Sequence, residues 1–133
     1  KYMIPQESGR IINISSMYGK LVIPNQAPYC TTKHALNGLT KVVAAEVGEI
    51  GITVNALCPG GVLTDVMKES GPAAAESLGM EFEEFLVWMQ QPSAIKRMNT
   101  VEDCALVAVL LASEAGAGIT GSCISIDGGQ APY

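Results

Sequence analysis

The order of three segments restricts the possible folds of this chain more than any other feature. Residues 10–15 form a short, β-branched apolar run that starts after Gly9, which is typical of a buried strand. Residues 28–46 then place apolar side chains three and four positions apart, the period of an amphipathic helix. Residues 53–57 form a second apolar run. A strand, a helix and a strand in this order predict a right-handed parallel crossover.

Two more elements are predicted further along the chain. The sequence Thr-Val-Glu-Asp at residues 100–103 resembles a capping box, which starts a helix that runs to about Ser113. Residues 123–126 form a last short apolar strand. The predicted fold class is therefore α/β, with three parallel strands joined by crossover helices.

The end of the first strand and the start of the long helix carry three side chains with a shared chemical use. Ser16 follows the strand, and Tyr29 and Lys33 lie one turn apart on one face of the helix. A free tyrosine has a pKa of about 10 and is a poor base at neutral pH, but a lysine cation one turn away favours the phenolate. A serine hydroxyl can hydrogen-bond the oxygen that the tyrosine protonates. These groups predict conversion of a carbonyl to an alcohol, or the reverse.

Three motifs in order resemble the short-chain dehydrogenase/reductase family. A tyrosine and a lysine at helical spacing occur by chance in many helices, whereas three ordered motifs with strand and helix patterns between them are specific. The Asp-Gly-Gly that follows the last strand also resembles the single-domain branch of that family, with its 3-oxoacyl reductases and hydroxybutyrate dehydrogenases. The motifs are Asn13-Ile14-Ser15-Ser16, Tyr29-Cys30-Thr31-Thr32-Lys33 and Pro59-Gly60-Gly61-Val62-Leu63-Thr64.

The resemblance implies a role for each matched residue. Tyr29 is implied to be the general acid/base, Lys33 to promote its ionisation and bind the nicotinamide ribose, and Ser16 to orient the substrate carbonyl. The implied cofactor is NAD or NADP, and the implied substrate is a small ketone or secondary alcohol. Without the resemblance, Pro-Gly-Gly is no more than a turn signal. The cofactor-binding residues that the resemblance implies are Tyr29, Lys33, Pro59, Gly60, Val62 and Thr64.

The resemblance covers nearly all of this chain but only the C-terminal half of the family's fold. The family begins with a strand and a glycine-rich TGxxxGxG turn that holds the pyrophosphate, and neither that turn nor the family's catalytic asparagine is found here. A sheet of only three strands would also leave residues 10–15 as an open apolar edge. We therefore expect residues 1–133 to be the C-terminal portion of one doubly wound, Rossmann-type domain whose N-terminal dinucleotide-binding half is missing. The full-length protein is expected to be the enzyme, as a homodimer or homotetramer, and this fragment alone to be inactive.

Residues 65–99 lie where the family carries a variable substrate lid. Residues 61–92 contain no arginine, and Lys68 is their only cation, which favours a neutral ketone, alcohol or acyl thioester over a small hydroxy acid. Lys96 or Arg97 further out leaves an anionic carrier group possible. Alternatively, the apolar side chains of this segment pack on the core or on a partner subunit. They are Phe82, Phe85, Leu86 and Met89.

Composition argues against several other classes of protein. The net charge of -5 does not suit a nucleic-acid surface, and no stretch reaches the roughly 18 to 20 apolar residues of a membrane span. The start lacks the apolar region of a signal peptide. The four cysteines form no CxxC pair, so neither a metal site nor a redox dithiol is indicated. We expect a cytoplasmic protein that binds no metal, nucleic acid or membrane.

Two rival functions stay open. A catalytically inactive remnant would act only in subunit association, because the family often pairs its tyrosine-bearing helix across a dimer interface. A serine hydrolase that uses Ser16 is disfavoured, since no G-x-S-x-G elbow surrounds it. A nucleophile made of Cys30 and His34 is disfavoured too, because single cysteines usually pack. A nicotinamide-absorbance assay on the full-length protein separates the main alternatives.

Overall fold

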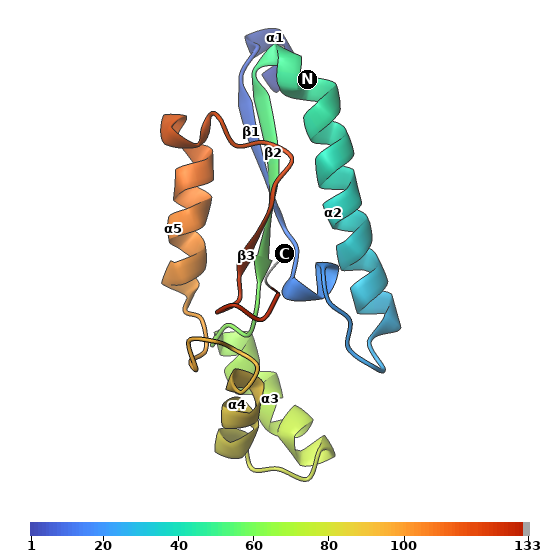
Figure 1. The fold of residues 1–133 in the computed structure, drawn as a ribbon, viewed down its shortest axis with the longest axis vertical. Helices are drawn as coiled ribbons and strands as arrows, with labels where there is room; N and C mark the ends of the chain where they lie inside the picture. The colour runs from blue at the N-terminus through green and yellow to red at the C-terminus, as the bar shows by residue number, and fades with distance from the viewer. Residues whose placement is uncertain (132–133) are drawn as a thin grey trace.

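Three parallel strands with a helix on each face form the body of the molecule, as a computed structural model of residues 1–131 shows. The sheet order is β1-β2-β3. Helix α2 covers one face of the sheet and helix α5 covers the other (Figure 1). The predicted α/β class with three parallel strands is therefore confirmed. The elements of this body are β1 (Gly9–Ile14), α2 (Ala27–Val47), β2 (Ile52–Pro59), α5 (Val101–Ala112) and β3 (Cys123–Ile126).

The crossover from β1 through α2 to β2 follows the prediction closely. Pro28 stands in the first turn of α2, where its missing N–H costs no hydrogen bond. After α2, the short 3-10 helix η2 (Gly48–Ile50) ends at Gly51, whose φ of 73° lies in the left-handed region that glycine tolerates. The two strands pair in parallel, with Ile11 opposite Val54. The crossover predicted from the strand, helix and strand patterns of the sequence is thus present in the structure.

The side of the sheet that faces α2 changes from apolar to polar along the strands. Near the start of the strands, Ile11, Ile52 and Val54 pack with Ala44 of α2. Near their carboxyl ends, Asn13 and the following residues hydrogen-bond to α2 instead. The polar end of this interface is the end at which Ser16 lies.

A helical hairpin follows β2, and the sequence indicated only its second half. Helix α4 (Phe82–Gln90) matches the predicted amphipathic patch, whereas helix α3 (Asp65–Ser77) was not predicted. Gly71 and Pro72 lie inside α3, and both residue types disfavour a helix interior. Gly71 is buried under the ring of Phe82, which leaves no room for a side chain. The packing of α3 on α4 therefore overrides the local preference.

The remaining elements are short. Helix α1 (Met3–Gln6) precedes β1, the 3-10 helix η1 (Met17–Gly19) follows it, and η3 (Glu114–Gly116) follows α5. The predicted capping box at Thr100 and Asp103 is present at the start of α5. Within residues 1–131, no helix combines the length and the apolar character needed to cross a membrane.

Strand β1 lies at an edge of the sheet. Among the described residues it pairs only with β2. The side chain of Ile14 at its carboxyl end is 59% exposed. The open apolar edge expected from the sequence is thus seen in the structure of residues 1–131.

Candidate active site

The predicted catalytic residues gather at the carboxyl ends of β1 and β2. Ser16 is buried and has an extended backbone that caps η1, where its Oγ accepts a hydrogen bond of 3.1 Å from the Tyr18 N–H. One lone pair of the hydroxyl is thereby engaged. Its own proton remains available for donation to a ligand.

Tyr29 and Lys33 lie one turn apart at the start of α2. Tyr29 is 42% exposed. The Lys33 Nζ lies 5.6 Å from the centroid of the Tyr29 ring and donates a hydrogen bond of 2.9 Å to the Ile14 carbonyl. The ammonium is therefore held between the phenol ring and the end of β1.

Tyr18 contacts both Ser16 and Tyr29. Its N–H donates to Ser16, and its ring meets the Tyr29 ring edge-on, with centroids 6.5 Å apart. Burial, followed by the neighbouring Cys30 and Tyr29, raises the pKa of Tyr18. Tyr18 therefore keeps its proton at neutral pH and serves as an aromatic neighbour of Tyr29.

A row of hydrogen bonds, here called the polar seam, joins α2 to β1 and η1. The bonds lie on the face of α2 that also carries Lys33, and they continue along it for two turns. The bonds of Ser15 and Gly19 hold the serine turn against the helix, and the bond of Asn13 holds strand β1 against it. The polar seam consists of Ser15 Oγ to the Lys33 carbonyl (3.3 Å), Asn37 Nδ2 to the Gly19 carbonyl (2.9 Å) and Asn13 Nδ2 to Thr40 Oγ1 (2.9 Å).

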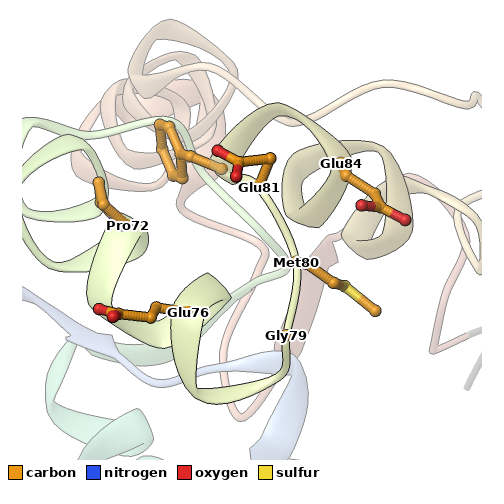
Figure 2. Close-up of a pocket in the computed structure, with 7 residues that line it drawn as sticks. Pro72, Glu76, Gly79, Met80, Glu81 and Glu84 are labelled. Carbon is orange, nitrogen blue, oxygen red and sulfur yellow. The ribbon is translucent and has the colours of Figure 1, made fainter.

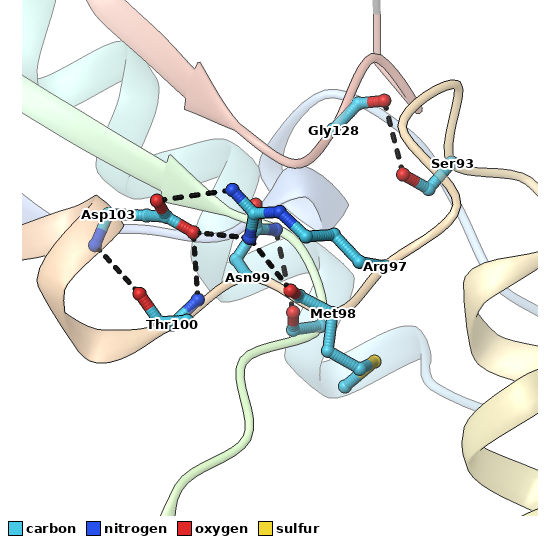
Figure 3. Close-up of polar contacts among 8 residues, drawn as sticks. Ser93, Arg97, Met98, Asn99, Thr100, Asp103 and Gly128 are labelled. Carbon is cyan, nitrogen blue, oxygen red and sulfur yellow. Dashed lines mark hydrogen bonds and ion pairs between the residues drawn. The ribbon is translucent and has the colours of Figure 1, made fainter.

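The turn after β2 is held by a residue far along the chain. The Asn99 N–H donates to the Gly61 carbonyl at 2.9 Å, and its carbonyl accepts from the Leu63 N–H at 3.2 Å. Figure 3 shows Asn99 between this turn and the start of α5. A side chain at Gly60 would lie 2.8 Å from Asp127 Cα, so only glycine fits there. The turn therefore has a fixed course across the carboxyl end of the sheet.

Several donors on and near this turn suit a nicotinamide cofactor. Within residues 1–131, no group accepts a hydrogen bond from the Val62 N–H. The Thr64 Oγ accepts from the Met67 N–H, which leaves its proton to donate. Among the described residues, Lys33 uses one of its three N–H donors, in the bond to the Ile14 carbonyl. An amide N–H for a carboxamide, a hydroxyl and an ammonium for ribose oxygens make a donor set that fits this group.

The α3–α4 hairpin contains a pocket of about 470 Å³ that is lined by three glutamates and by Pro72, Gly79, Met80 and Phe82. Figure 2 shows the carboxylates of Glu76, Glu81 and Glu84 around the loop between the helices. Of the four apolar side chains expected in the lid, only Phe82 lines this pocket. Phe85 is buried and stacks on Trp88. Phe85 is thus packed inside the hairpin, whereas Val66, Leu78 and Val87 are more than half exposed.

The cations near the lid are engaged within the chain. Lys68 pairs with Asp65 at 2.9 Å, and Arg97 pairs with Asp103 through two nitrogens at 2.6 and 3.3 Å (Figure 3). The Lys96 Nζ donates to the Gln91 carbonyl. Lys68 and Lys96 each keep N–H donors that an anionic carrier group could use, because an ammonium has three donors.

His34 and the cysteines behave as packing or surface residues. His34 is exposed, and its Nδ1 lies 2.9 Å from the Cys30 carbonyl. Cys30 and Cys58 are buried, and burial raises the pKa of Cys58. A thiol that keeps its proton is a poor nucleophile.

Sequence reasoning missed Tyr18, Asn37 and Asn99. A signal existed for Asn37, because a polar residue four positions after Lys33 interrupts the inner face of the helix. No local signal pointed to Asn99, since its partner Val62 is distant in the sequence.

The chain is similar to known oxidoreductases over nearly its whole length. A family model described as enoyl-(acyl carrier protein) reductase matches residues 1–131. A D-beta-hydroxybutyrate dehydrogenase of Rhizobium meliloti (strain 1021) is 43% identical over 122 residues, which are 91% of this chain and 47% of that protein. The chain spans about half the length of the curated relatives it matches.

Solved structures of similar sequence share the fold. A variant of actinorhodin polyketide ketoreductase with NADPH has a TM-score of 0.91 at 30% identity, over 98% of this chain and 50% of that chain. The sorbitol-6-phosphate 2-dehydrogenase of Erwinia amylovora has a TM-score of 0.90 at 34% identity, over 96% of this chain and 51% of that chain.

Proposed function

The chain belongs to the short-chain dehydrogenase/reductase family, and we propose that the full-length protein transfers a hydride between NAD or NADP and a ketone or secondary alcohol. One observation carries the proposal: the Lys33 Nζ lies 5.6 Å from the Tyr29 ring and is bonded to the carbonyl that precedes the serine turn. A phenol, an ammonium and the Ser16 hydroxyl thus share one edge of the sheet. The related ketoreductase structure with NADPH supports the choice of cofactor.

Each of the three side chains has a separate task in this reaction. During reduction, the Tyr29 hydroxyl donates its proton to the substrate oxygen, and Lys33 stabilises the phenolate that remains. Ser16 donates its free proton in a hydrogen bond to the same oxygen, where negative charge develops. The nicotinamide, when bound, supplies the hydride in reduction and accepts it in oxidation. In oxidation, the phenolate takes the proton of the alcohol.

The turn after β2 is proposed to bind the nicotinamide. The Val62 N–H and the Thr64 hydroxyl supply donors, while Pro59 and Gly60 set the course of the backbone. Lys33 uses its remaining N–H donors for ribose hydroxyls, and Tyr29 lies beside it. These residues line the carboxyl end of the sheet, where open α/β sheets bind ligands.

The chain is proposed to supply the C-terminal portion of a Rossmann-type domain, with residues 65–99 as its substrate lid. Exposed apolar side chains on α2 and α5 support a homo-oligomer, since large apolar surfaces are usually covered in assemblies. They include Leu39 and Val42 on α2, and Leu106 and Val109 on α5.

Substitution of Tyr29 by phenylalanine in the full-length protein tests the proposal. The ring and its packing remain, while the proton donor is lost, so we expect turnover to fall by a factor of about 10² to 10⁴. Oxidation of NADH or NADPH with a panel of ketones measures it. His34→Ala is the matched control, because it removes an exposed titratable side chain from the same helix. Equal turnover of Tyr29→Phe and wild type would overturn the assignment.

A further inference from the structure

We propose that Asn37 is a positioning residue for this reaction, which holds the turn carrying Ser16 at a fixed distance from the helix that carries Tyr29 and Lys33. The inference rests on the proposed function and extends it to a residue that touches neither substrate nor cofactor.

Two consecutive hydrogen bonds connect Asn37 to Ser16. Asn37 lies on α2 one turn after Lys33 and is only 6% exposed. Its Nδ2 donates to the Gly19 carbonyl at 2.9 Å. The Gly19 N–H in turn donates to the Ser16 carbonyl at 2.9 Å. A shift of the Asn37 amide therefore reaches the backbone of Ser16 through one residue.

The serine turn approaches α2 so closely that little freedom remains. A Cβ at Gly19 would lie 2.6 Å from Asn37 Nδ2, 2.8 Å from Ser15 Oγ and 2.9 Å from the Lys33 carbonyl. Direct contact between the backbone of Gly19 and the side-chain amide of Asn37 sets the distance between the serine turn and α2. A longer or shorter side chain at position 37 would have to change it.

The other end of the amide contacts the strand that leads to the cofactor turn. Asn37 Oδ1 accepts a hydrogen bond from the Cys58 Sγ at 3.8 Å, and Cys58 directly precedes Pro59 and Gly60. Burial raises the pKa of the Cys58 thiol, so the proton needed for this bond is present. The orientation of the amide is fixed, because the Gly19 carbonyl can only accept and the thiol donates. One side chain therefore joins the serine turn to the end of strand β2, from which the cofactor turn begins.

Thr40 provides a comparison on the same helix. It is fully buried, and its Oγ1 accepts from Asn13 Nδ2 and donates to the Leu36 carbonyl. Its partner lies within β1 rather than in the serine turn. Thr40 thus makes the same kind of buried polar link between helix and strand, without a connection to Ser16.

The experiment compares Asn37→Leu, Asn37→Asp and Thr40→Val in the full-length protein. All three should lower the melting temperature. Only the Asn37 variants should lower kcat, by about 10- to 100-fold, because misplacement of reacting groups by about 1 Å costs up to 10²-fold. KM should change much less than kcat. Asn37→Asp keeps the shape of the side chain and provides the measurement if Asn37→Leu does not fold.

A double-mutant cycle with Ser16→Ala separates positioning from general loss of stability. If Asn37 acts through Ser16, its substitution should cost little more once the serine hydroxyl is gone. The inference would be overturned if the fold-losses in kcat of the Asn37 and Ser16 substitutions multiplied in full in the double mutant. A kcat of Asn37→Asp equal to that of Thr40→Val would also overturn it. The result is distinguishable from failure of the proposed function, which would appear as an active Tyr29→Phe enzyme.

Discussion

Lys33 is anchored to the end of β1 through both its backbone and its side chain. Its carbonyl accepts from Ser15 Oγ, and its ammonium donates to the Ile14 carbonyl. A flexible side chain is thereby restricted to one position beside Tyr29. At the scale of single residues, hydrogen bonds thus hold both the backbone and the side chain of Lys33 at the end of β1.

Lys33→Met in the full-length protein should affect catalysis and cofactor binding together. Loss of the cation disfavours the phenolate, so alcohol oxidation should require a higher pH. Loss of a charged donor should weaken NAD or NADP binding by about tenfold or more. A pH profile of the oxidation rate and a fluorescence titration with cofactor measure the two effects. Lys41→Met, on the exposed face of the same helix, is the control, and an unchanged pH profile in Lys33→Met would contradict the assigned role.

Gly19→Ala should destabilise the protein by about 1 to 3 kcal/mol, because the added methyl group would overlap fixed backbone and side-chain atoms. Gly38→Ala on α2 should instead stabilise it by about 0.5 to 1 kcal/mol, since no atom lies within 4 Å of the new methyl group and alanine favours a helix. Thermal unfolding of both variants measures the difference. Similar effects of the two substitutions would argue against the close contact at Gly19.

The sequence identified the residues of the candidate site whose spacing is local. Tyr29 and Lys33 follow from helical periodicity, and Ser16 follows from the end of a strand. Asn99 could not be found this way, because the whole α3–α4 hairpin separates it in the sequence from Val62, beside which it lies in the fold. Tyr18 was missed because it lies in the single 3-10 turn η1, which is too short to show a periodic pattern that would predict its partner.

At the scale of elements, the start of α5 shows how a helix and the preceding loop stabilise each other. Thr100 Oγ1 accepts from the Asp103 N–H, and the Asp103 carboxylate accepts from the Thr100 N–H and from Arg97. Thr100→Ala should therefore lower the free energy of unfolding by about 1 kcal/mol. Thr100→Ser keeps the hydroxyl and is the control. Chemical denaturation of both variants at neutral pH measures the loss, and equal stability would contradict the role of the cap.

The same cap predicts a dependence of stability on pH. Hydrogen bonds from Arg97 and Thr100 lower the pKa of Asp103 to about 2, below its ordinary value of 3.8. A carboxyl with a lowered folded-state pKa stabilises the protein above about pH 4, and this contribution is lost as the pH falls through about 2. The stability difference between wild type and Asp103→Asn should therefore shrink over that range. A difference that stays constant down to pH 2 would show that the carboxylate does not contribute through its charge.

The sequence predicted those elements in which the apolar pattern and the residues at the ends of the element indicate the same secondary structure. Strands β1, β2 and β3 and helices α2 and α5 combine apolar periodicity with caps or turn residues. Helix α3 lacks such agreement, because Gly71 is required by the ring of Phe82 and not by the helix itself. Helix α3, which the local sequence did not predict, is therefore stabilised by its tertiary packing.

At the scale of the whole molecule, the open edge of β1 predicts self-association of the 133-residue chain when it is produced alone. The edge is apolar and offers unpaired backbone groups, which favour pairing with another chain. Sedimentation velocity at rising concentration should show oligomers. Ile14→Lys at the edge should reduce them, whereas Val22→Lys, in an exposed loop, should not. A chain that stays monomeric at all concentrations would contradict this expectation.

The polar seam also determines where α2 can lie along its own axis. Apolar contacts such as those of Ala44 with Ile52 and Val54 would tolerate a slide of the helix by one turn, about 5.4 Å. The seam would not, because such a slide would leave the half-buried Asn13 and the buried Ser15 and Asn37 without their partners, at about 1 to 3 kcal/mol for each of the two buried groups. The hydrogen bonds of the seam thus allow only one position of α2 along its axis. In that position, Tyr29 and Lys33 lie level with the end of β1.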